Sequence, residues 1–176
     1  MRIAVGADHR GYALKALLIG RLAQDGHDVI DLGTFDPAQP SDYPDLAASV
    51  ARMIRRGRAD RGLLLCGSGV GASVAANKIP GIRAGMCHDT FSARQGVEDD
   101  DANVLAIGTG VVGLELAWEV TRAWVGARFV GAERHVRRLK KVAALEREFG
   151  RPRTGVAGAP ASTRRRKRPA KRSLWG

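Results

Sequence analysis

Between residues 1 and 149, short apolar runs alternate with longer amphipathic segments, and this alternation constrains the fold more than any other feature of the sequence. The runs have the length of strands. The run at 62–66 is almost entirely leucine, as expected of a strand that is covered on both faces. Regular alternation of strands and helices, with right-handed crossovers, is typical of a parallel sheet. We therefore predict an α/β fold, a doubly wound (Rossmann-like) sheet of five parallel strands with helices on both faces.

The same pattern predicts where the elements and the domain end. The predicted strands cover residues 3–6, 28–32, 62–66, 83–87 and 103–107. The predicted helices cover residues 13–24, 44–56, 69–77, 113–125 and 133–149. Residues 1–150 form one domain in this prediction. The remainder, 151–176, is rich in Pro, Gly, Ala, Ser, Thr and basic residues, and cannot bury enough apolar area to offset its ordering entropy. We expect it to be a disordered basic tail.

The net charge of +11 belongs to this tail rather than to the domain. Nine of the 29 Lys and Arg residues lie in 151–176 with no acid, which leaves 20 basic against 18 acidic side chains in 1–150. Charge therefore does not indicate a nucleic acid as the partner of the domain, and only weak, non-specific contact by the tail is expected. The two cysteines suit a reducing compartment, and we see no signal peptide and no apolar run of the roughly 20 residues that cross a bilayer. The sequence thus predicts a cytoplasmic protein without a membrane partner.

The strongest local motif is Cys66-Gly67-Ser68-Gly69-Val70-Gly71, which joins the leucine-rich strand to a helix. Ligands of open α/β sheets bind at the carboxyl ends of the strands, where this turn lies. Its glycines let the backbone approach a ligand, and its amides can bind an oxyanion or a phosphate. A tight strand-to-helix connection is the alternative. At the end of a strand before a helix, Cys66 is a candidate base as its thiolate, or else a small buried apolar residue. Cys87 lacks such a loop, and we expect it to be structural.

Other charged side chains stand near predicted strand or helix ends. Asp8 and His9 follow the first strand and could hold a sugar hydroxyl or a phosphate, although Asp8 could equally cap the next helix. The acidic run 98–101 is typical of a solvated surface, and it reaches the same edge of the sheet only if the helix before it is short. Arg134 and Arg138 stand in the first turns of the last helix. Basic residues there oppose the helix dipole, which indicates that they bind an anion.

Together and in this order, the motifs resemble the family of type B ribose-5-phosphate isomerases and galactose-6-phosphate isomerase subunits. The resemblance covers residues 1–149. The segments that carry it are Ala7-Asp8-His9-Arg10-Gly11, Asp42-Tyr43-Pro44, the glycine turn, Ala75-Ala76-Asn77-Lys78, Asn103-Val104-Leu105, Val112-Gly113 and Arg134-His135. It implies interconversion of ribose 5-phosphate and ribulose 5-phosphate through an enediolate, with no metal or organic cofactor. It also implies a homodimer with active sites across the subunit boundary, with a tetramer as a further option.

The resemblance also assigns roles to individual residues. Cys66 matches the base of one branch of the family, and Ser68 matches a hydroxyl residue that assists the transfer between the two substrate oxygens. Arg134 and Arg138 match phosphate ligands that are contributed to the neighbouring subunit's site. The positions expected to bind substrate or phosphate are Asp8, His9, Tyr43, Gly67, Gly69, Val70, Gly71, Asp100, Arg134 and Arg138.

Three positions depart from the pattern of the family. Asp99, expected at a catalytic position, stands where relatives commonly have the His that opens the furanose ring. Asp100 stands where some relatives have Asn, and Gly110 replaces an Arg that often contacts substrate. Three hypotheses therefore remain open: isomerisation of ribose 5-phosphate, isomerisation of another phosphosugar with four or six carbons, and a non-catalytic phosphosugar-binding or nucleic-acid-associated protein.

Overall fold

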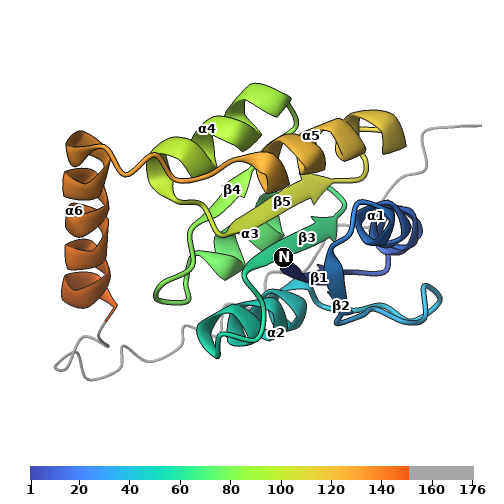
Figure 1. The fold of residues 1–176 in the computed structure, drawn as a ribbon. Helices are drawn as coiled ribbons and strands as arrows, with labels where there is room; N and C mark the ends of the chain where they lie inside the picture. The colour runs from blue at the N-terminus through green and yellow to red at the C-terminus, as the bar shows by residue number, and fades with distance from the viewer. Residues whose placement is uncertain (151–176) are drawn as a thin grey trace, which may run out of the picture.

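The structure is a computed structural model that describes residues 1–150 (Figure 1). Its centre is a single parallel sheet. Its strands are β1 (Arg2–Ala7), β2 (Asp28–Asp31), β3 (Arg61–Cys66), β4 (Ala84–Met86) and β5 (Val104–Gly108). They lie in the order β2-β1-β3-β5-β4, and every pairing is parallel. The predicted doubly wound sheet of five parallel strands is confirmed. The predicted tail, 151–176, lies outside the described residues.

Helices cover both faces of this sheet. They are α1 (Tyr12–Gln24), α2 (Tyr43–Arg55), α3 (Val70–Ala76), α4 (Thr90–Asp100), α5 (Leu114–Gly126) and α6 (Glu133–Phe149). Buried residues of α1, α4 and α5 share one core with the sheet, and those of α2 and α3 share the other. Helix α6 stands apart from the sheet, and among the helices and strands it packs mainly against α4 (Figure 1). None of the helices between residues 1 and 150 is long and apolar enough to cross a membrane.

The alternation of side chains along β3 fixes which face each residue serves. Leu63 and Leu65 belong to the core beneath α1, α4 and α5, whereas Leu64 and Cys66 belong to the core beneath α2 and α3. A slip of one residue would exchange the two sets, so the register is strongly specified. Consequently Cys66 faces α2 and α3 at the carboxyl edge of the sheet.

Helix α4 is the element that the apolar pattern does not reveal, because only Ala93 and Val97 are buried in it. Its start is marked by Asp89, whose carboxylate accepts a hydrogen bond from the Ser92 N–H at 2.7 Å. The helix has 11 residues and is therefore about 16 Å long. It returns the chain from the carboxyl edge of the sheet to the amino edge. The acidic run 98–101 thus lies at the amino edge. It would have reached the carboxyl edge only if the helix before it were short, which α4 is not.

A buried lysine anchors the loop that leads from β2 to α2. The Lys15 ammonium donates to both carboxylate oxygens of Asp31, at 2.6 and 2.8 Å, and to the carbonyl of Thr34 at 2.8 Å. It also lies 5.6 Å from the ring centroid of Tyr12 and 5.0 Å from that of Phe35. The charge is thereby satisfied inside the domain, and the start of the loop is held against α1.

We expect Lys15→Ala to lower the free energy of unfolding, because it leaves the Asp31 carboxylate without its cation. The Asp31 side chain is 35% exposed, so water compensates in part and the loss should be about 1–3 kcal/mol, below that for a fully buried pair. Urea denaturation followed by circular dichroism measures it. Arg2→Ala, which breaks the exposed Arg2–Asp60 pair, is the matched control and should shift the midpoint far less. Equal shifts would contradict the role of Lys15.

Candidate active site

The turn between β3 and α3 is shaped by glycines that pack directly against β5. Gly69 precedes α3 with a φ of +82°, a conformation that favours glycine. A Cβ added there would lie 3.0 Å from the Met86 side chain and 3.2 Å from the Gly108 nitrogen. A Cβ on Gly108 would lie 2.6 Å from the carbonyl carbon of Ser68. Two backbones therefore meet with no side chain between them, and the turn is held at the carboxyl edge of the sheet.

Cys66 occupies the last position of β3, directly before this turn. Its side chain is buried, and its sulfur accepts a hydrogen bond from the Gly69 N–H at 3.2 Å. A backbone donor directed at sulfur stabilises negative charge there, as a thiolate requires. Ser68 is exposed two residues further on, and its hydroxyl oxygen lies 3.4 Å from the Val70 nitrogen. The turn thus presents a thiol, a hydroxyl and backbone amides at one place.

The second cysteine has a different environment. Burial, and then the charge of Asp89, raises the pKa of Cys87 to about 11. Its thiol is therefore protonated near neutral pH and is a poor base. This supports the interpretation of Cys87 as a structural residue.

Asp8 and His9 lie at the same edge of the sheet, as predicted. Asp8 does not cap α1; its carboxylate instead accepts hydrogen bonds from the Arg10 and Gly11 N–H groups, both at 3.0 Å, and is buried. The N–H of His9 donates to the Ser41 hydroxyl at 3.0 Å, and the Ser41 N–H donates to His9 Nδ1 at 3.4 Å. An imidazole that accepts at Nδ1 has Nε2 as its donor. His9 can thus offer an N–H to a ligand.

Two supporting residues of this edge were missed by sequence reasoning. Ser41 orients His9, although the only signal for it is its place directly before the Asp42-Tyr43-Pro44 motif. His88 follows β4, and its Nε2 accepts the Gly108 N–H at 2.9 Å, which holds Gly108 against the turn. The position of His88 after the predicted strand 83–87 does not by itself indicate that it contacts Gly108. The pairing depends on β4 and β5 being neighbours.

Tyr43 also belongs to this group. A Cβ on Gly71 would lie 2.8 Å from the Tyr43 ring, so the ring packs against the first turn of α3. The first group of predicted site residues, which the structure brings together at the carboxyl edge, consists of Asp8, His9, Tyr43, Cys66, Gly67, Ser68, Gly69, Val70 and Gly71. Gly110 lies beside them, since its N–H donates to the Gly67 carbonyl at 2.9 Å.

The remaining predicted residues form a second group at the amino edge of the sheet and on α6. Asp99 lies 3.5 Å from Nε2 of His135, whose side chain is only 1% exposed. Arg134 precedes His135, and Arg138 lies one turn further along α6; both are exposed. Asp100 ends α4 next to Asp99. Asp99, Asp100, Arg134 and Arg138 are thus neighbours through α4 and α6.

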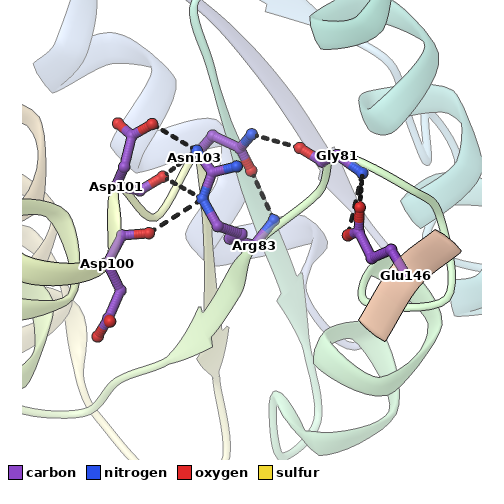
Figure 2. A network of polar contacts seen from close by, with 6 residues as sticks. All are labelled: Gly81, Arg83, Asp100, Asp101, Asn103 and Glu146. Carbon is purple, nitrogen blue, oxygen red and sulfur yellow. Dashed lines mark hydrogen bonds and ion pairs between the residues drawn. The ribbon is translucent and has the colours of Figure 1, made fainter. Parts of the chain in front are cut away.

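A polar network holds this second group in place (Figure 2). The Arg83 guanidinium donates to the carbonyls of Asp100 and Asp101 at 2.9 and 2.8 Å and to the Asp101 carboxylate at 2.6 Å. The Gly81 N–H donates to the carboxylate of Glu146 on α6 at 3.2 Å (Figure 2). The chain that follows α4 and the body of α6 are therefore tied to the same segment before β4.

Within one chain, Asp99 and Asp100 of the second group lie far from the first group. Cys66 pairs with Gly108 at one end of β5, whereas the acidic run precedes Val104 at the other end. Four residue steps along a parallel strand span about 13 Å. Asp99 and Asp100 therefore lie at the edge opposite to Cys66 of the same chain, where sequence reasoning did not place them.

Comparison with known proteins matches this arrangement to a family. Residues 3–142 match the family described as Ribose/Galactose Isomerase. Ribose-5-phosphate isomerase B of Escherichia coli is 45% identical over 145 residues, which cover 82% of this chain and 96% of that protein. D-erythrulose-4-phosphate isomerase of Pectobacterium atrosepticum is 43% identical, over 74% of this chain and 86% of that protein. The solved ribose-5-phosphate isomerase B of Clostridium thermocellum superposes with a TM-score of 0.82 at 44% identity and covers 85% of this chain and 99% of its own.

The chain belongs to the ribose/galactose isomerase family. The resemblance predicted from the motifs is confirmed, and with it the enzyme class, an isomerase that interconverts aldoses and ketoses. For a ribose/galactose isomerase the first group has a suitable composition, since it offers a thiol, a hydroxyl, an imidazole and backbone amides beside one another. Within residues 1–150, no three His, Cys, Asp or Glu side chains gather as a metal site would need. The individual roles of the site residues stay predictions.

Because positioned acid–base catalysis contributes about 10²–10⁴-fold, we expect Cys66→Ala to lose at least 10²-fold in turnover while remaining folded. Cys87→Ala is the matched control, and should retain turnover within about threefold because its thiol, protonated near neutral pH, cannot serve as the base. Steady-state kinetics on purified variants measures both, with circular dichroism as the check on folding. More than a tenth of the original turnover in Cys66→Ala would rule the thiol out as the base.

Proposed function

We propose that this ribose/galactose isomerase interconverts ribose 5-phosphate and ribulose 5-phosphate, with Cys66 as the base. The observation that carries the proposal is the buried Cys66 thiol at the carboxyl edge, with a backbone N–H directed at its sulfur and the Ser68 hydroxyl next to it. The relative of Escherichia coli, which matches 82% of this chain, is named for the same substrate. The cytoplasmic location stays a prediction from the sequence.

The proposed reaction moves one proton between neighbouring carbons. The Cys66 thiolate removes the proton from carbon 2 of the open-chain aldose, the electrons of that bond form the double bond between carbons 1 and 2, and negative charge develops on oxygen 1. The thiol then returns a proton to carbon 1, while the Ser68 hydroxyl relays a proton between oxygens 1 and 2. Amides of the turn 67–71 stabilise the developing charge. All electrons stay within the substrate, so that the step needs no redox partner.

We further propose that a homodimer completes the site. The first group contains the proposed base but no arginine, whereas Arg134 and Arg138 lie exposed on α6, which stands away from its own sheet (Figure 1). Guanidinium groups bind a phosphate dianion through paired hydrogen bonds. If α6 lies against a second copy, its arginines can reach the phosphate of a sugar bound at that copy's Cys66.

The surface around α6 supports a second copy as its partner. Leu145 is 54% exposed and Phe149 is 73% exposed on this helix. Between α6 and the edge strand β4 runs a groove of about 390 Å³, lined mainly by apolar side chains that include Ile82, Leu139 and Val142. A monomer rarely leaves an apolar groove and a sheet edge open side by side. A partner that buries them would bring α6 close to another catalytic turn.

A four-carbon phosphosugar is the second candidate substrate. Asp99 replaces the expected ring-opening His and lies beside His135. A carboxylate is normally only a base near neutral pH. An aldose with four carbons and a phosphate on carbon 4 cannot close a furanose ring, and so would need no ring opening. The relative of Pectobacterium atrosepticum is named D-erythrulose-4-phosphate isomerase.

A panel of substrates tests the proposed function. We expect the highest kcat/KM on ribose 5-phosphate, with at least a tenfold margin over erythrose 4-phosphate and galactose 6-phosphate, because one carbon unit in a fitted site is worth about 10–200-fold. The measurement is steady-state conversion at equal enzyme concentration. Preference for erythrose 4-phosphate would replace the proposal by the second candidate, and Asp99→His should then speed only the five-carbon reaction. No turnover on any phosphosugar would contradict both.

The shared site can be tested with two inactive variants. Cys66→Ala removes the base from the first group, and Arg134→Ala removes a phosphate ligand from the second. After denaturation and co-refolding, we expect the mixture to regain activity, since a hybrid dimer contains one site in which both groups are intact. The statistical limit is about a quarter of the wild-type activity, because half of the dimers are hybrids and each has one intact site of two. Two batches of Cys66→Ala refolded together form the control. Absence of recovery would show that each site is built from one chain.

A further inference from the structure

The segment that follows β1 is held rigidly beside the catalytic turn. The Asp8 N–H donates to the Leu65 carbonyl at 3.1 Å, and the Asp8 carboxylate accepts from the Arg10 and Gly11 N–H groups. A Cβ on Gly11 would lie 2.6 Å from the Leu65 carbonyl oxygen, so this glycine lets the segment pack onto the end of β3. On its other side, the Thr109 hydroxyl donates to the Arg10 carbonyl at 3.2 Å. The backbone of Arg10 is thus fixed between β3 and the end of β5.

The side chain of Arg10 lies over the backbone of the residue that follows Cys66. A Cβ added to Gly67 would meet the Arg10 Cζ and Nη1 atoms at 2.7 Å and Nε at 3.0 Å. The guanidinium therefore occupies the space that a side chain at position 67 would fill. The Gly110 N–H donates to the Gly67 carbonyl without bringing a side chain of its own. Arg10 is thus the long side chain that covers Gly67.

Among residues 1–150, no carboxylate forms an ion pair with Arg10, whereas Arg2, Arg21 and Arg83 each pair with an acid at 2.6 Å. A guanidinium presents five N–H donors and stays charged. Because it is exposed, lies over Gly67 and is unpaired in the described chain, it can bind an anion beside Cys66.

We propose that Arg10 is a further catalytic residue, whose guanidinium contacts the oxygens on carbons 1 and 2 of the substrate and stabilises the enediolate. The inference rests on the proposed function, because it places the reacting carbons next to Cys66. Gly67 follows Cys66 directly, so a group that covers Gly67 lies near the atoms on which negative charge develops. A charged donor at such a position acts more strongly on the developing charge of the transition state than on the bound substrate. The phosphate, by contrast, is assigned to Arg134 and Arg138.

The consequence is a separation of kinetic effects. We expect Arg10→Gln to lower kcat by about 10- to 100-fold and to change KM by less than about threefold, as for an interaction made chiefly in the transition state. Arg10→Lys keeps the positive charge but lacks the paired N–H donors of the guanidinium, so its kcat should fall less than that of Arg10→Gln. Arg55→Gln, on the exposed end of α2 at the opposite edge of the sheet, is the matched control and should leave both constants unchanged. A raised KM at constant kcat, or no change in either, would overturn the proposal.

A binding experiment separates this inference from the proposed function. The hydroxamate of 4-phospho-D-erythronate has a planar, anionic end that imitates the enediolate of a five-carbon substrate. We expect calorimetry to show at least tenfold weaker binding of this probe to Arg10→Gln than to the unchanged protein, as expected when a charged donor of a transition-state mimic is lost. Inorganic phosphate should bind both equally. Equal affinities for the hydroxamate would overturn the role of Arg10, whereas no binding to the unchanged protein would contradict the five-carbon substrate on which the inference rests. Arg10-dependent binding without turnover would instead locate the failure in the proposed function.

Discussion

The direct contact between β5 and the catalytic turn is the constraint on which the rest of the site depends. Gly108 has no side chain, so its backbone packs against Ser68, while Cys66 and Gly108 pair in the sheet. The thiol, the turn and the end of β5 therefore share one level at the carboxyl edge. Any Cβ at position 108 would push the turn away from the sheet. The acidic run lies beside the other end of β5, at Val104. The length of β5 therefore separates Asp99 and Asp100 from the first group of site residues.

This separation gives the projecting helix α6 a chemical meaning. In our proposal, each chain carries the base of one site at the carboxyl edge of its sheet, and the arginines that complete a partner's site on α6. The contacts of His135 with Asp99 and of Glu146 with Gly81 fix α6 at an angle to its own sheet (Figure 2 shows the second contact). In our account, the contacts that attach α6 to its own domain determine whether Arg134 and Arg138 can reach the phosphate of a sugar bound to a second chain. Arg10 supplies a positive charge from the near side, where Gly110 contributes none.

The sequence predicts the sheet well, because β1, β3 and β5 are buried on both faces and their apolar runs leave little choice. Residues at strand ends are predicted together for the same reason: parallel strands end at one edge. Helix α4 escapes the pattern since it buries little more than Ala93 and Val97. Because the length of α4 was not predicted, the sequence could not decide at which edge of the sheet Asp99 lies. Ser41, His88 and Arg10 act through contacts between segments distant in sequence, which local spacing does not record.

The most direct test of the account is the structure of the protein with ribulose 5-phosphate bound. We predict that carbons 1 and 2 lie beside the Cys66 sulfur of one chain, that the Arg10 guanidinium of that chain contacts their oxygens, and that Arg134 and Arg138 of a second chain bind the phosphate. A phosphate held entirely by the chain that supplies Cys66, or a substrate bound away from the turn at 66–71, would contradict the central claim.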